Sequence, residues 1–154
     1  MTLKDRLDAD MKTAMKAREA GKLRLSVIRM VRSAVKNAEI ERRSELTDAD
    51  ILGILAKEVK LRREANETIP ATERERRQDF IRQNKQEIAV LMEYLPEQMD
   101  EATIRKLVTT VIADVGAESP KEMGKVMAVL APQVKGKADG RTVSRIVKEM
   151  LENE

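Results

Sequence analysis

The chain contains no cysteine, no histidine and no tryptophan among its 154 residues. Their absence removes thiolate nucleophiles, imidazole bases and the Cys and His ligand sets of zinc sites. Phosphate-loop and dinucleotide-binding signatures are absent as well. We therefore expect no catalytic residue, no metal and no other cofactor. Because a chain without cysteine fits a reducing compartment, we expect a cytoplasmic protein.

Long apolar runs and aromatic side chains are equally scarce. No segment reaches the roughly 20 apolar residues that a membrane-spanning helix needs. The amino-terminal stretch MTLKDRLDADMKTAMK lacks the apolar core of a signal peptide, so we expect a soluble protein without a membrane partner. With one Phe and one Tyr in the chain, any contact with nucleic acid is expected to involve its backbone and shape rather than base stacking.

Charged residues of both signs are abundant and make up 37% of the chain, whereas there are only six glycines and four prolines. This composition is typical of long solvated helices. Apolar residues recur at helical spacing, and no segment alternates as a strand would. We predict an all-α fold, with a four-segment helical amino-terminal domain in residues 1–96 and a three-helix carboxy-terminal bundle in residues 97–154.

Capping signals locate the expected helices. Thr2 with Asp5, and Thr47 with Asp50, have the spacing of a capping box, in which two residues satisfy each other's backbone N–H groups. Thr72 is expected to cap the fourth helix. The seven predicted helices cover residues 2–21, 22–43, 47–67, 72–95, 100–116, 119–132 and 139–151.

The sixth predicted helix has the most marked signals. Ser119, followed by Pro120 and Glu122, is typical of a helix start. Pro132 is expected to kink or stop this helix, because proline removes a backbone donor. Gly124 inside it predicts the close approach of another helix or a ligand, since glycine lowers helix stability.

Basic residues are in excess around the stretch KGKADGRTV, residues 135–143. Between residues 121 and 148, seven Lys and Arg residues stand against two acids. Backbone N–H groups near the two glycines, with cations around them, can hold a phosphate. A simple turn that ends a helix explains the glycine equally well, and both interpretations stay open. The candidate nucleic-acid-binding residues are Lys125, Lys135, Gly136, Lys137, Arg141 and Arg145.

A second basic stripe follows the helix predicted for residues 22–43. Its members fall within about 80° of each other on a helical wheel, opposite the apolar face. The stripe is either a solvated face neutralised by acids of a neighbouring helix or a surface that contacts phosphates. The five residues are Lys22, Arg29, Arg32, Lys36 and Arg43.

Two acidic pairs, Asp8 with Asp10 and Asp48 with Asp50, raise the question of a metal site. Residues two apart on a helix diverge by about 200°, so neither pair is expected to share a metal ion. Asp48 and Asp50 are better explained as first-turn acids that suit the helix dipole.

Several short motifs resemble those of the YqeY family and follow one another in the same order as in that family, over almost the whole chain. They are Ser26-Val-Ile-Arg-Met30, Leu46-Thr-Asp48, Lys57-Glu-Val-Lys60, Tyr94-Leu-Pro-Glu-Gln98, Met123-Gly-Lys-Val-Met127 and Lys135-Gly-Lys-Ala-Asp139. The carboxy-terminal part is similar to the tail domain of the GatB subunit of the bacterial tRNA-dependent Asp/Glu amidotransferase. This resemblance implies a helical fold and contact with tRNA. The amidotransferase's catalytic apparatus has no matching positions in this sequence.

Three functions stay open at this point. The first is a small non-catalytic protein that binds tRNA, or a complex carrying tRNA, through the last bundle. The second is an adaptor whose long front helices dock onto a partner protein. The third, implied by the label that family members often carry, is an amidotransferase-linked factor with carbon–nitrogen ligase activity that uses glutamine as the amide donor.

Overall fold

The computed structural model describes residues 1–153, and every regular element in that range is a helix. The predicted all-α fold is therefore confirmed. The chain divides into two compact units, Met1–Leu95 and Pro96–Glu154, and the predicted boundary lies one residue from this division. Within residues 1–153, no helix combines the length and apolar character needed to cross a membrane.

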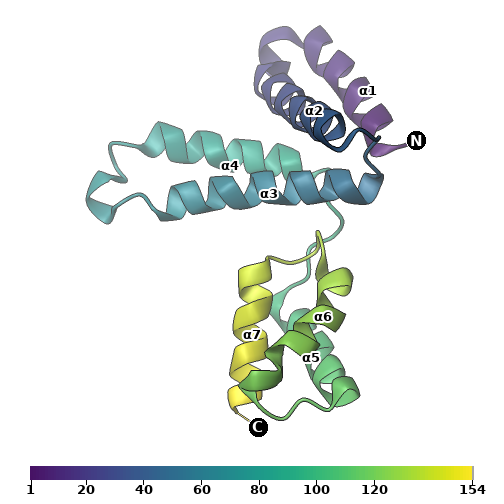
Figure 1. Cartoon of the computed structure of the whole chain (residues 1–154). Helices are drawn as coiled ribbons and strands as arrows, with labels where there is room; N and C mark the ends of the chain where they lie inside the picture. Colours follow the sequence, from purple (N-terminus) through teal and green to yellow (C-terminus); the bar gives the residue numbers. More distant parts are fainter. Residues whose placement is uncertain (154) are drawn as a thin grey trace. The chain divides into compact units, whose positions relative to one another are not determined.

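The first unit consists of two helical hairpins (Figure 1). Its elements are α1 (Leu3–Lys16), the 3₁₀ turn η1 (Arg18–Gly21), α2 (Lys22–Arg42), α3 (Asp48–Glu67), the 3₁₀ turn η2 (Ala71–Glu73) and α4 (Gln78–Met92). α1 packs on α2, and α3 lies alongside α4. Apolar side chains of all four α-helices form one buried core, which Tyr94 joins just after α4.

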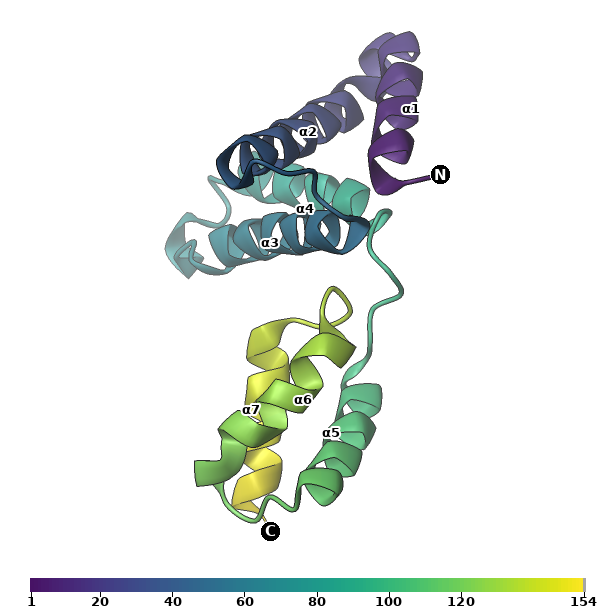
Figure 2. The ribbon, with the colours of Figure 1, turned by 45° about the vertical axis from the view of Figure 1, so that its right-hand side comes forward.

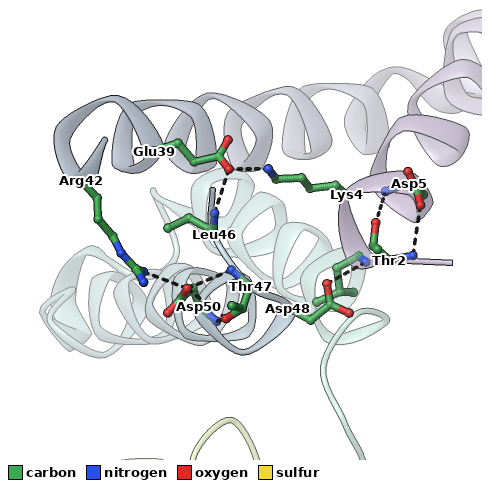
Figure 3. Close-up of polar contacts among 10 residues, drawn as sticks. Thr2, Lys4, Asp5, Glu39, Arg42, Leu46, Thr47, Asp48 and Asp50 are labelled. Atoms are coloured by element: carbon green, nitrogen blue, oxygen red, sulfur yellow. Dashed lines mark hydrogen bonds and ion pairs between the residues drawn. The ribbon is translucent and has the colours of Figure 1, made fainter. Parts of the chain in front are cut away.

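Both capping boxes predicted for this unit are confirmed (Figure 3). The Thr2 hydroxyl accepts a hydrogen bond from the Asp5 N–H at 3.1 Å, and the Asp5 carboxylate accepts one from the Thr2 N–H at 3.2 Å. Thr47 and Asp50 repeat the arrangement at the start of α3. These bonds satisfy backbone donors that a helix start would otherwise leave without a partner.

Longer-range polar contacts join the starts of α1 and α3 to the end of α2 (Figure 3). The Asp48 carboxylate accepts a hydrogen bond from the Leu3 N–H at 3.1 Å, so a residue of α3 caps α1. Glu39 of α2 pairs with Lys4 and accepts a hydrogen bond from the Leu46 N–H at 2.8 Å. The loop before α3 is thereby fixed between the two hairpins.

The second unit is a three-helix bundle (Figure 2). Its elements are α5 (Glu101–Val115), the 3₁₀ turn η3 (Pro120–Glu122), α6 (Met123–Val134) and α7 (Gly140–Glu152). Each helix packs against the other two around a separate buried core. Asp100 caps α5 by accepting a hydrogen bond from the Thr103 N–H at 2.7 Å, and Gly116 ends that helix with a left-handed φ of 70°.

One predicted helix start is wrong, and another begins with a 3₁₀ turn. The fourth helix begins at Gln78 rather than at Thr72, after the short turn η2 and without a side-chain cap. No side chain between Ala71 and Phe80 is buried, so tertiary packing does not extend the helix into this stretch. Ser119 is the N-cap of η3, with Pro120 in its first turn as predicted, but its side chain makes no capping hydrogen bond. η3 continues directly into α6, which starts at Met123.

For the interior of α6, the structure excludes one alternative of each of two predictions: Pro132 does not stop the helix, and no other helix within residues 1–153 lies close to Gly124. The helix continues through Pro132 to Val134, because Val134 is buried in the core and the Lys135 N–H still reaches the Ala131 carbonyl at 3.1 Å. Gly124 is exposed, and a Cβ placed on it would meet no atom within 4 Å. No helix of the described chain therefore approaches Gly124 closely.

Candidate nucleic-acid interface

The turn between α6 and α7 contains the centre of the predicted site. Gly136 has a left-handed φ of 76°, as expected of a glycine that ends a helix. Lys135 and Lys137 flank it, and both side chains are exposed. The turn interpretation is therefore correct for Gly136, and the two lysines are presented on either side of it.

The segment before α5 fixes this turn in place. The Met99 N–H donates a hydrogen bond to the Lys137 carbonyl at 2.8 Å. The Gln98 side-chain amide donates to the carbonyls of Gly136 and Pro96, each at 2.8 Å. A Cβ on Gly136 would lie 4.0 Å from the Pro96 ring. The amino-terminal segment of the second unit thus contacts the turn and holds its backbone from one side.

Several backbone N–H groups of the turn already donate within the protein. Those of Lys137 and Ala138 donate to the Val134 carbonyl, at 2.8 and 3.0 Å. The Asp139 carboxylate accepts from the Arg141 N–H at 3.3 Å and caps α7. Because a carboxylate occupies the start of α7, a phosphate bound there would meet a negative charge. The geometry favours contact through the lysine side chains over a backbone cradle.

Arg145 belongs to an ion-pair network rather than to an open basic surface. Its guanidinium contacts Glu149 at 3.1 Å and Glu101 at 3.4 Å. Arg105 contacts the same two carboxylates, Glu101 at 2.9 Å and Glu149 at 3.0 Å. These contacts lower the pKa values of Glu101 and Glu149, with the hydrogen bonds from Arg105 as the largest cause. The network joins α5 to α7 and compensates the charge of Arg145.

Lys125 and Arg141 differ in position from the two turn lysines. Lys125 lies near the start of α6, about 15 Å along the helix from Lys135, and its ammonium is 3.7 Å from the Glu122 carboxylate. Arg141 is exposed in the first turn of α7, close in sequence to the turn. The structure therefore groups Lys135, Lys137 and Arg141 at one end of the bundle and separates Lys125 from them.

Of the five residues predicted to form the stripe on α2, one forms an ion pair and another lies beyond the helix, which leaves three of them as the stripe. The Arg32 guanidinium contacts the Asp8 carboxylate of α1 at 2.7 Å, which compensates its charge. Arg43 lies beyond α2 as its C-cap, with a left-handed φ of 59°. Lys22, Arg29 and Lys36 are exposed, and within residues 1–153 none of these three forms an ion pair.

The acidic pairs diverge as predicted and serve separate contacts. Asp8 contacts Arg32, whereas Asp10 accepts a hydrogen bond from the Tyr94 hydroxyl. Asp48 caps α1, and Asp50 caps α3 and contacts Arg42 at 2.8 Å. Among residues 1–153, no group of three or more acidic side chains gathers where it could hold a metal ion.

Sequence reasoning missed three residues that contribute to this end of the bundle. Gln98 and Met99 bond directly to the turn, from which 38 residues of chain separate them. Glu101 was not connected with Arg145, which lies 44 residues later. The only available signal was the motif Tyr94-Leu-Pro-Glu-Gln98, whose Gln98 side chain can reach backbone carbonyls.

Comparison with known proteins gives one match that covers nearly the whole chain. The model of the family described as Yqey-like protein matches residues 4–151. No curated protein matches the chain.

Proposed function

Because the chain belongs to the Yqey-like protein family, we propose that it is a non-catalytic helical protein that binds tRNA, or a complex carrying tRNA, in the cytoplasm. The contact is made by Lys135 and Lys137, with Arg141 beside them. The observation that carries this proposal is the fixed turn between α6 and α7, which presents two exposed lysines on either side of Gly136.

A fixed turn suits binding to a folded RNA. The hydrogen bonds from Met99 and Gln98 hold the backbone between the two lysines, so less conformational freedom is lost on binding. Lysine side chains contact phosphates without reading the sequence. With few aromatic residues in the chain, recognition then depends on the shape of the RNA and on where its phosphates lie.

The directions of the shifted pKa values do not favour general acid–base catalysis. Hydrogen bonds from Thr47 are the main cause that lowers the pKa of Asp50 to about 2. Arg24 lowers the pKa of Glu93, and burial raises the pKa of Tyr94. Shifted groups gather at catalytic centres in many enzymes. Here the shifted carboxylates have lowered pKa values and the pKa of Tyr94 is raised, so none of these pKa values moves toward neutral pH, where a general acid or base works best.

The proposal is tested by the salt dependence of tRNA binding. Fluorescence anisotropy with a labelled tRNA transcript, between 50 and 200 mM salt, compares the wild type with Lys135→Gln/Lys137→Gln. Loss of two phosphate contacts lowers the slope of log K against log salt by about 1.4 to 1.8. The ratio of the binding constant at 50 mM salt to the binding constant at 200 mM salt then falls by about 7- to 12-fold.

A matched control removes two exposed lysines elsewhere in the same unit, Lys106→Gln/Lys121→Gln. An equal change in slope for both double variants would reject the site. Absence of tRNA binding by the wild type would reject the function. Glutamine-dependent amidation by the purified chain would support the ligase alternative, and salt-insensitive capture of a protein partner would support the adaptor alternative.

A further inference from the structure

We propose that the outward face of α2 is a second RNA-binding surface, which contacts the phosphate backbone through a regular row of cations and hydroxyls. The basic row is defined as Lys22, Ser26, Arg29, Ser33 and Lys36. All five side chains are exposed. This inference rests on the proposed function, since it takes RNA as the ligand, but it concerns the other unit of the chain.

The spacing of the basic row gives a straight line of positive charge. Lys22, Arg29 and Lys36 are seven residues apart, so they lie about 10.5 Å from one another along the helix axis. A heptad spacing drifts by only about 20° around the helix, which keeps the three cations on one side. Ser26 and Ser33 stand between them, and Asn37 is exposed beside the last cation. Arg, Lys, Ser and Asn are the usual donors to phosphate oxygens.

The surroundings of the basic row leave its charge uncompensated. The other basic residues of α2 pair with acids: Arg24 with Glu93, Arg32 with Asp8 and Arg42 with Asp50. Glu39 of α2 lies on another side of the helix, where it pairs with Lys4. α2 also has no acid in its first turn, where an acid would favour the helix dipole.

The opposite face of α2 is occupied, which argues against a membrane as the ligand. Val27, Ile28, Val31 and Val35 are buried in the core of the first unit. A helix that lies on a membrane surface inserts its apolar face into the lipid, and here that face packs within the protein. The exposed face offers donors and positive charge, which are complementary to a phosphate backbone.

The test compares two triple variants of the full chain. Lys22→Gln/Arg29→Gln/Lys36→Gln removes the cations of the basic row. The control, Lys57→Gln/Lys60→Gln/Lys85→Gln, removes three exposed cations from α3 and α4, with the same change in net charge. Binding to a labelled tRNA transcript is measured between 50 and 200 mM salt. Loss of three phosphate contacts lowers the ratio of the binding constants at 50 and 200 mM salt by about 20- to 40-fold. The control variant is expected to keep most of this ratio.

A second variant tests the basic row without removing a cation. Ser26→Glu/Ser33→Glu places carboxylates between the three positive side chains, and we expect at least tenfold weaker tRNA binding. Circular dichroism verifies that each variant keeps its helices. If both basic-row variants bind like the wild type, or if the control loses as much as the triple variant, the inference is overturned. It is also overturned if the basic row is needed only for binding to vesicles containing phosphatidylserine.

The outcome separates this inference from the proposed function. If Lys135→Gln/Lys137→Gln weakens tRNA binding and the basic-row variants do not, the proposed function stands and the second surface is rejected. If the basic-row variants weaken binding and the turn variant does not, RNA binding stands and its site lies on α2. If the wild type does not bind tRNA at all, both proposals fail.

Discussion

Gly21 is the position where the structure makes the sharpest stability prediction. It is buried at the corner between α1 and α2, and a Cβ built on it would lie 2.2 Å from the Ala14 carbonyl oxygen. A non-bonded contact between carbon and oxygen needs roughly 3.3 Å, so Gly21→Ala has to open this corner by about 1 Å. The clashing atoms belong to the backbone of Ala14, which a side-chain rotation cannot move.

The expected cost follows from this clash. Overpacking of a core costs about 1 to 3 kcal/mol, and a clash with backbone belongs at the upper end. Alanine has less conformational freedom than glycine in the unfolded chain, which offsets about 0.4 to 1 kcal/mol of this loss of stability. We expect Gly21→Ala to lower the free energy of unfolding of the first unit by about 2 kcal/mol, which lowers its Tm by about 8 to 16 °C.

Tyr94 provides the assay for this prediction. It is the only tyrosine, the chain has no tryptophan, and its ring is buried in the core of the first unit. Tyrosine fluorescence during thermal unfolding therefore reports the first unit, whereas circular dichroism reports both. The control is Gly124→Ala, where a Cβ meets nothing within 4 Å. It should stabilise the second unit by about 1 kcal/mol without moving the tyrosine transition. A Tm for Gly21→Ala within about 2 °C of the wild type would refute the packing argument.

Two further predictions use the same tyrosine signal in urea titrations. The pKa of Asp50 is lowered from 3.8 to about 2, so its stabilising contribution is complete above about pH 4 and is lost as the pH falls toward 2. Asp50→Asn should therefore flatten the dependence of the urea midpoint on pH in this window, and an unchanged dependence would contradict the assignment. Asn84 is buried, and its side-chain amide donates to the Asn66 side-chain oxygen at 2.9 Å, so Asn84→Ala should cost about 1 to 3 kcal/mol. The double variant with Asn66→Ala should cost less than the sum of the two single variants, and strict additivity would show that the pair is not coupled.

Local contacts explain why much of the fold could be predicted from the sequence. The capping boxes at Thr2 and Thr47 close between residues three apart, so they depend on the helix alone. Gly116 and Gly136 adopt the left-handed φ that their places after α5 and α6 require. Apolar residues at helical spacing were sufficient to predict the all-α class, because each helix has to bury one face.

The sequence was less informative where tertiary packing competes with local signals. Thr72 has a suitable capping side chain, but no buried residue follows it until α4 has begun at Gln78. Pro132 is a strong helix breaker, but buried Val134 keeps the helix continuous beyond it. In the first case no buried side chain supports the local signal, and in the second the burial of an apolar side chain outweighs it.

The sequence by itself determined where the cations of this protein lie along each helix, and only the tertiary structure decided which of them remain available. Arg145 and Arg32 fit the basic surfaces predicted from their helices, but Glu101 and Asp8 reach them from neighbouring helices. Lys135, Lys137, Lys22, Arg29 and Lys36 keep exposed side chains. The physical reason is that periodicity fixes the direction of a side chain around its own helix, whereas charge compensation depends on which helix packs beside it.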